Sequence, residues 1–217
     1  MELAELIGAV ASYVTECGGA PTKTKVLKLL YLLDIDTYRR TNQTLTGFDW
    51  IFYLYGPWAA SYDDALSDAA HTEIIRIVAP EAGDEGATFI NPVQRLPLAR
   101  VFPSFVQELG AKRIIEAWAS KPVVELLDYV YFHTAPMRDA TRGAALDFST
   151  VSNEESFPHY FGIKSKPTEV KEINRKRRQF LDSMKLVRKA QIAPLDPPPQ
   201  YDDIYQSAVS KLESEFD

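Results

Sequence analysis

The spacing of apolar residues changes from a helical period to a strand-like one near the start of this 217-residue chain. In residues 2–15 and 22–40 the apolar side chains recur every three or four positions, which predicts two helices, the second apolar on more than one side. Thr22 is a residue type preferred as the N-cap of that second helix. Residues 48–55 alternate instead and predict a strand, with one face formed by Phe48, Trp50, Phe52 and Leu54.

A small sheet is expected to follow. Gly56 and Pro57 predict a sharp turn from the first strand into a helix, because proline suits the first turn of a helix. The helix that follows has its apolar face within residues 58–69. Residues 74–79 and 88–91 are two further strand candidates around a loop rich in glycine and acidic residues, which predicts a hairpin. The three strands together predict one small antiparallel sheet.

Two further helices are expected after Pro103. The first has two apolar groups separated by Gly110; these groups are Phe105, Val106 and Leu109, then Ile114, Ile115 and Trp118. The second begins at Pro122 and ends before Pro136, because a proline disfavours helical geometry in the residue before it. Residues 144–148 fit a strand or an ordered loop. The predicted fold class is mainly α (α+β), a helical domain with a small antiparallel β-sheet and a long helical C-terminal extension.

Charge divides the chain into two parts. The net charge is −6, but residues 164–190 hold ten basic and three acidic residues, a net charge of +7, and the remainder has a net charge of −13. Such asymmetry indicates an acidic body with a basic appendage. The composition turns polar from residue 152, which predicts one domain over residues 1–152. Residues 153–217 then form a basic helix (168–191), a proline-rich linker and a terminal helix.

Residue types that carry common chemistry are sparse. Cys17 is the only cysteine, which excludes a disulfide within the chain, and the three histidines are far apart in the sequence, so neither a cysteine-based nor a histidine-spaced zinc site is predicted. No phosphate-binding glycine loop or hydrolase motif is present. Cys17 is expected to be an inert thiol, and His133 to interact with the dipole at the end of its helix. We predict no catalytic residue, cofactor or metal, and a protein that is not an enzyme.

The N-terminal residues predict a cytoplasmic protein. The first five residues contain two acids and no Lys or Arg, which is unlike the positively charged start of a signal peptide. No apolar run approaches the roughly 18 residues needed to span a bilayer. We therefore expect no membrane association.

Two short motifs resemble those of a known family. Lys28-Leu29-Leu30-Tyr31 lies on the second predicted helix, and an aromatic strand about twenty-five residues later ends in Tyr55-Gly56-Pro57. This order and spacing resemble the Panacea domain, also called SocA-like, which is found in bacterial antitoxins and prophage-associated proteins. The resemblance extends roughly from Leu3 to Phe148. One departure is Trp58, where the family often has a small apolar residue.

The motif residues are interpreted first as structural. Leu29 and Leu30 are core residues by type, and Tyr31 is expected to bury its ring with the hydroxyl at a hydrogen-bond partner. Lys28 is expected to extend its amine to the domain edge, and Gly56-Pro57 to form a hinge between strand and helix. The alternative is that the motif forms a contact surface.

The resemblance implies an antitoxin that neutralises a cognate toxin protein by direct binding. Some members of the family act instead as adaptors that deliver the toxin to a bacterial protease. The competing hypothesis is a nucleic-acid-binding regulator that uses the basic helix at residues 168–191; an enzyme is the third. The sequence leaves the oligomeric state open.

Two groups of residues are candidates for binding a partner. The first is aromatic, and tyrosine and tryptophan are enriched at interface hot spots; its members are Trp50, Tyr53, Tyr55 and Trp58. The second is basic and would contact an acidic partner or nucleic acid; its members are Arg175, Lys176 and Arg178. Core packing with ordinary surface tyrosines, and a solvated helix face, are the respective alternatives.

Overall fold

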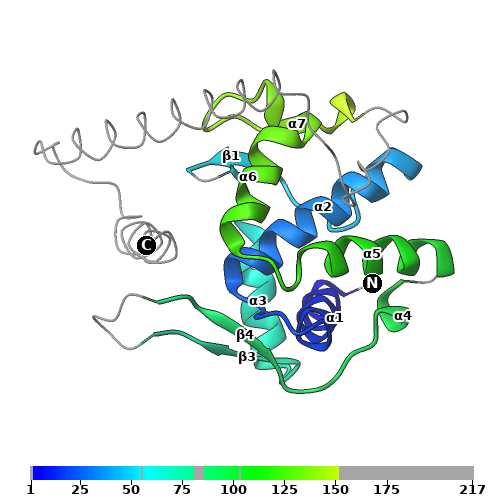
Figure 1. Ribbon diagram of the computed structural model, residues 1–217, viewed down its shortest axis with the longest axis vertical. Helices are drawn as coiled ribbons and strands as arrows, with labels where there is room; N and C mark the ends of the chain where they lie inside the picture. The colour runs from blue at the N-terminus through cyan, green and yellow to red at the C-terminus, as the bar shows by residue number, and fades with distance from the viewer. Residues whose placement is uncertain (1, 55, 81–85, 103, 152–217) are drawn as a thin grey trace, which may run out of the picture. The chain divides into compact units, whose positions relative to one another are not determined.

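Helix α2 (Lys23–Thr41) lies at the centre of the fold. The structure is a computed structural model that describes residues 2–54, 56–80, 86–102 and 104–151. All eleven residues of α2 from 25 to 35 are buried. Helices α1 (Leu3–Glu16), α5 (Phe105–Trp118) and α6 (Val123–His133) pack against α2 (Figure 1). The prediction that this helix is apolar on more than one side is confirmed.

The start of α2 follows the predicted signal. Thr22 is the N-cap of α2, and its hydroxyl accepts a hydrogen bond from the backbone N–H of Lys25 over 3.2 Å. Asn42 ends α2 in the left-handed conformation, with φ of 55°. Between α1 and α2 the chain passes close to α5: a Cβ on Gly19 would lie 2.0 Å from the carbonyl oxygen of Ala119. Only glycine fits at this crossing.

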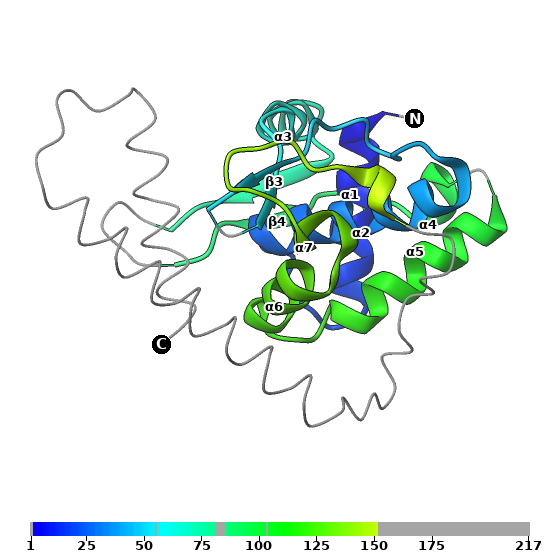
Figure 2. The ribbon, with the colours of Figure 1, turned by 90° about the horizontal axis from the view of Figure 1, so that it is seen from above.

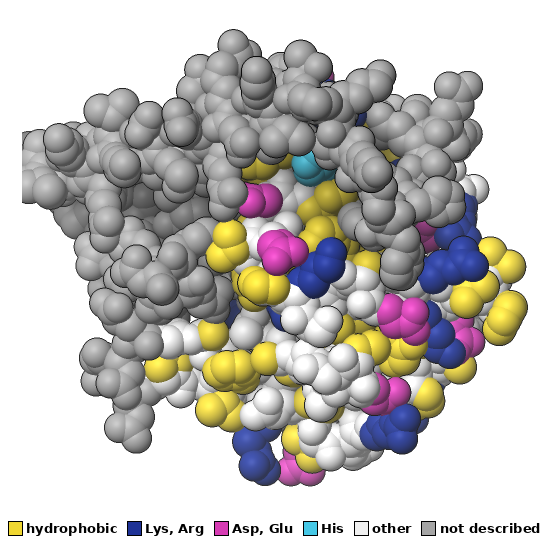
Figure 3. All heavy atoms as spheres, viewed as in Figure 1, with side chains coloured by type: hydrophobic (Ala, Val, Ile, Leu, Met, Phe, Trp, Pro, Cys, Tyr) yellow, Lys and Arg dark blue, Asp and Glu magenta, His cyan; other side chains and the backbone are white. Residues whose placement is uncertain are grey.

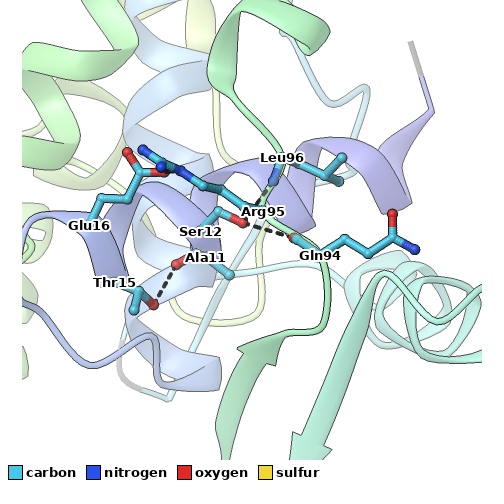
Figure 4. A network of polar contacts seen from close by, with 7 residues as sticks. All are labelled: Ala11, Ser12, Thr15, Glu16, Gln94, Arg95 and Leu96. Carbon is cyan, nitrogen blue, oxygen red and sulfur yellow. Dashed lines mark hydrogen bonds and ion pairs between the residues drawn. The ribbon is translucent and has the colours of Figure 1, made fainter.

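A polar network fastens the segment 94–96 to α1 (Figure 4). The hydroxyl of Ser12, which is buried in α1, donates to the carbonyl of Gln94 and accepts from the N–H of Leu96. Arg95 pairs at the surface with Glu16 over 2.6 Å. The side chain of Leu96 is buried, so the network holds an apolar residue against the core.

The strands form two separate antiparallel hairpins, not one sheet of three strands. In the first, β1 (Ile51–Tyr53) pairs with β2 (Gly56–Trp58). In the second, β3 (Ile75–Val78) pairs with β4 (Phe89–Pro92). The 75–92 hairpin confirms the predicted strand pair, whereas the prediction of a single sheet is wrong.

The Gly56-Pro57 segment is a strand and not the start of a helix. Pro57 is opposite Phe52, whose N–H and C=O bond to residues 144 and 143 on the other side of β1. No backbone hydrogen bond therefore joins Phe52 to Pro57 across the hairpin. A proline at this position removes no hydrogen bond between the two strands. The predicted strand-to-helix hinge is wrong, because helix α3 (Ser61–His71) begins only after Ala60.

Three short elements and α3 complete the fold. Figure 2 shows α3 on one side of α2 and α6 on the other. The short helices are α4 (Leu98–Val101), α7 (Ala135–Arg138) and the 3₁₀ helix η1 (Phe148–Thr150). Residues 143–146 form an ordered loop beside β1, with one bridge between Ile51 and Ala145. Over the described residues the fold is mostly helical with small antiparallel sheets, as predicted.

Helix α5 is continuous through Gly110, and its two apolar groups lie in different surroundings. Ile114, Ile115 and Trp118 are buried against the core. Phe105 and Val106 are 73% and 60% exposed. The apolar group at the start of α5 is therefore a surface patch.

Candidate functional site

Every third residue of the buried part of α2 carries a polar group that holds another segment. The four are Lys25, Lys28, Tyr31 and Asp34. Lys25 donates to the carbonyls of Ala119 and Lys121 at the end of α5, over 2.8 and 2.9 Å. A spacing of three residues advances 300° around a helix, so the four groups point in successive directions and reach four different parts of the fold.

Lys28 is buried and joins the two sequence motifs. Its Nζ donates to the carbonyl oxygen of Pro57 over 2.7 Å, across 29 residues of sequence. The residue is 4% exposed, so the expectation that its amine reaches the domain edge is wrong. The Pro57 carbonyl is free to accept because it points away from the β1 ladder. Burial lowers the pKa of Lys28 to about 7.

Gly56 has a backbone conformation that only glycine adopts without strain. Its φ is +113°, while a Cβ would meet ordinary contacts at 3.9 Å from Lys28 Nζ and Val130 Cγ1. We expect Gly56→Val to lower the free energy of unfolding by about 1–3 kcal/mol through backbone strain. Urea unfolding followed by circular dichroism measures it. An unchanged midpoint would contradict this role.

Tyr31 is fully buried, as its motif position predicts. Its hydroxyl lies 3.0 Å from the hydroxyl of Thr134, which in turn donates to the carbonyl of Val130. Its ring packs edge-on against Trp50 and Phe148, with centroids 5.3 and 5.9 Å away. Tyr31 therefore holds both the end of α6 and the loop after α2 against helix α2. Leu29 and Leu30 are fully buried beside it.

Asp34 holds the loop that precedes β1. Its carboxylate accepts the N–H of Leu45 (2.7 Å), the N–H and hydroxyl of Thr46 (2.8 Å for the N–H), and the indole N–H of Trp50 (2.6 Å). Burial raises the pKa of Asp34, and these hydrogen bonds act in the opposite direction. Sequence reasoning missed this residue. The available signal was an acidic residue directly after the apolar run at residues 29–33 of the helix.

The β1–β2 hairpin has one buried and one half-exposed face. Phe52 and Pro57 face the core. The other face carries the half-buried residues Ile51, Tyr53 and Trp58, and the rings of Tyr53 and Trp58 lie 5.3 Å apart. This surface, defined by these three residues, is called the hairpin face below.

The structure separates the predicted partner-binding residues. Tyr53 and Trp58 share the hairpin face, whereas Trp50 is 3% exposed and belongs to the Asp34 network. The other four predicted residues lie outside the described part of the chain; they are Tyr55, Arg175, Lys176 and Arg178. The predicted boundary at residue 152 stays a prediction.

Cys17 follows α1 and His133 ends α6, and burial shifts the pKa of each. Burial, with Glu116 and Glu16 nearby, raises the pKa of Cys17, which disfavours the reactive thiolate. His133 ends α6 and stacks on Tyr129, with centroids 5.7 Å apart, and its burial lowers its pKa. Among the described residues, no group of three or more His, Cys, Asp or Glu is placed to hold a metal ion.

Comparison with known proteins finds one family. The family described as antitoxin SocA-like, Panacea domain matches residues 26–91. This range contains both motifs, the Lys28–Pro57 contact and Asp34, and the resemblance seen in the sequence is confirmed over it. No curated protein and no solved structure gives a significant match. None of the described helices is long and apolar enough to cross a membrane.

Proposed function

We propose that this chain is an antitoxin that neutralises a cognate toxin protein by binding it directly. The observation that carries the proposal is the match of residues 26–91 to the SocA-like antitoxin domain. Within that range the motif residues Lys28, Tyr31 and Gly56 are used for folding, so the motif defines a scaffold. Binding of the partner then falls to surface residues that this scaffold positions.

The hairpin face is the contact surface that we favour within the matched range. Tyr53 and Trp58 are half-buried and adjacent, and aromatic residues in such surroundings are common anchors at interfaces. The hairpin is held from behind by the Lys28–Pro57 hydrogen bond and beside β1 by residues 143–146. A surface fixed in this way loses little conformational entropy when it binds.

Growth of bacteria tests the function. Each reading frame next to the gene is expressed alone and together with this chain. We expect one product that stops growth alone, is tolerated with the chain and copurifies with it. If the amount of the toxin falls during co-expression in normal cells but not in cells that lack their main proteases, the chain acts as an adaptor for degradation. Absence of neutralisation, with strongly salt-dependent binding to nucleic acid, would favour a regulator that uses residues 168–191.

The hairpin face gives a direct prediction. Replacing Tyr53 and Trp58 together by Ala should weaken toxin binding about 30-fold or more, as hot-spot residues do. Isothermal titration with the purified toxin measures the affinity. The matched control is Phe105→Ala with Val106→Ala, which removes exposed apolar surface from α5 instead. Equal loss of affinity in both variants would contradict the assignment to the hairpin face.

A further inference from the structure

Strand β3 pairs with β4 along one edge, and its other edge is open as far as the structure describes the chain. In the second hairpin β4 is the inner strand: the N–H of Ile90 donates to Pro21 and the N–H of Lys23 donates to Thr88, over 2.8 and 2.7 Å. Figure 1 shows β4 toward the turn between α1 and α2, with β3 on the outer side of the hairpin. Among the described residues no strand pairs with the outer edge of β3.

The register identifies the backbone groups on that edge. The N–H of Val93 donates to the carbonyl of Ile74, so residues 74, 76 and 78 direct their backbone groups toward β4. Residues between them direct theirs outward. Ile77 is opposite Ile90, whose N–H points away from β3 toward Pro21, and this agrees with the alternation. The N–H and C=O groups of Ile75 and Ile77 therefore face the open edge.

The side chains leave the edge accessible. Ile77 and Val78 are 40% and 41% exposed, and Phe89, which is opposite Val78, is 37% exposed. Figure 3 shows hydrophobic side chains at the surface over this hairpin. Natural sheets usually protect an open edge with several charged side chains, proline or a bulge, or keep the edge strand very short. Here β3 reads Ile75-Arg76-Ile77-Val78, and its one charged side chain, Arg76, is exposed.

We propose that an extended segment of the toxin pairs antiparallel with the outer edge of β3, with an acidic residue opposite Arg76. This inference rests on the proposed function and names a second surface for the same partner. Another extended backbone matches a row of outward N–H and C=O groups at this spacing, as in strand addition to a sheet edge. When Ile75 and Ile77 form the hydrogen-bonded pairs, the residue opposite Arg76 occupies the closely spaced position, where side chains interact most directly.

Charge argues against a second copy of this chain as the occupant. A two-fold pairing that uses both Ile75 and Ile77 places Arg76 directly opposite its own equivalent. Like charges in that position destabilise a strand pair, whereas a carboxylate stabilises it. The edge therefore fits a different chain with an acidic residue between apolar ones.

Hydrogen exchange of the complex with the toxin identified by the growth experiment tests the proposal. In the free chain the amide of Ile77 should exchange rapidly, while those of Arg76 and Val78, which face β4, are protected. Toxin should slow exchange at Ile77 tenfold or more and change the other two little. A complex that forms without protecting Ile77 would overturn the edge pairing and leave the proposed function standing. If no toxin binds, both fail.

Two substitutions at one position provide a second test. Ile77→Pro removes the outward N–H but none of the bonds to β4, since proline is tolerated at an edge position of this kind. Ile77→Thr is the matched control, because it keeps the N–H and a strand-favouring side chain. We expect about tenfold weaker toxin binding for Ile77→Pro and less than about threefold for Ile77→Thr. Equal affinities, or protection of Ile77 by dimerisation of the free chain, would overturn the proposal.

Discussion

Replacing Asp34 by Ala should lower the free energy of unfolding by about 3–5 kcal/mol, because it breaks a buried hydrogen-bond network with four donors. The substitution leaves the N–H groups of Leu45 and Thr46, the hydroxyl of Thr46 and the indole N–H of Trp50 without their acceptor. Each buried donor left unsatisfied costs about 1–3 kcal/mol before relaxation. Equilibrium unfolding in urea, followed by tryptophan fluorescence, measures the loss and reports on Trp50 directly.

Asp63 provides the matched control for this prediction. It pairs with Lys23 at the surface, and both side chains are 40% exposed. Exposed ion pairs contribute about 0–1 kcal/mol, so Asp63→Ala should leave the unfolding midpoint nearly unchanged. If Asp34→Ala destabilised the protein no more than Asp63→Ala does, the loop before β1 would not depend on the carboxylate.

The helical part of the fold could be predicted because its signals are local. The apolar period sets α1 and α2, and Thr22 marks the start of α2 through a hydrogen bond to a residue three positions on. Burial of α2 on all sides follows from apolar residues around its whole circumference. The 75–92 hairpin was likewise found from two strand patterns around a turn-rich loop.

The first hairpin was misjudged because its cause is not local. Pro57 after Gly56 is compatible with a helix start or with an edge position in a strand. The deciding fact is that the backbone groups of Phe52 form hydrogen bonds with residues 143 and 144. Pro57, which is opposite Phe52, then needs no backbone hydrogen bond to β1. No pattern within residues 48–60 contains that information, since it depends on a segment about ninety residues later.

The candidate site was only half predictable for a similar reason. Tyr53 and Trp58 were identified from composition, and the register places them on one face. Trp50 is a tryptophan like Trp58, but its indole N–H donates to the carboxylate of Asp34, sixteen residues earlier in the chain. Charged residues are rarely buried without partners, so Lys28 is expected at the domain edge, and the sequence analysis does not single out Asp34. Their partners are backbone groups and loop side chains that only the folded chain brings together.

Burial of Lys28 predicts a stability that rises with pH. The pKa is about 7 in the folded protein and about 10.4 in an unfolded chain. Between these values the unfolded state binds more protons, so the free energy of unfolding increases by about 1.4 kcal/mol per pH unit. From pH 7 to 9.5 we expect a gain of about 3 kcal/mol in urea unfolding. The raised pKa values of Cys17 and of buried tyrosines such as Tyr31 and Tyr62 act oppositely at the upper end of this range, so a Cys17→Ala background is used to remove the contribution of the thiol.

Lys28→Met in that background should abolish the pH slope, because methionine keeps an unbranched apolar side chain of similar length and has no proton to lose. Lys23→Met is the control on the same helix: the side chain of Lys23 is 40% exposed, and the slope should persist. Persistence of the slope in Lys28→Met would assign it to another group, and a flat profile in the parent would mean that Lys28 keeps its charge when the chain folds. A confirmed slope would show that above about pH 7 the amine meets Pro57 uncharged, so that the contact between the two motifs is then a neutral hydrogen bond inside the core and not a charge available to a partner.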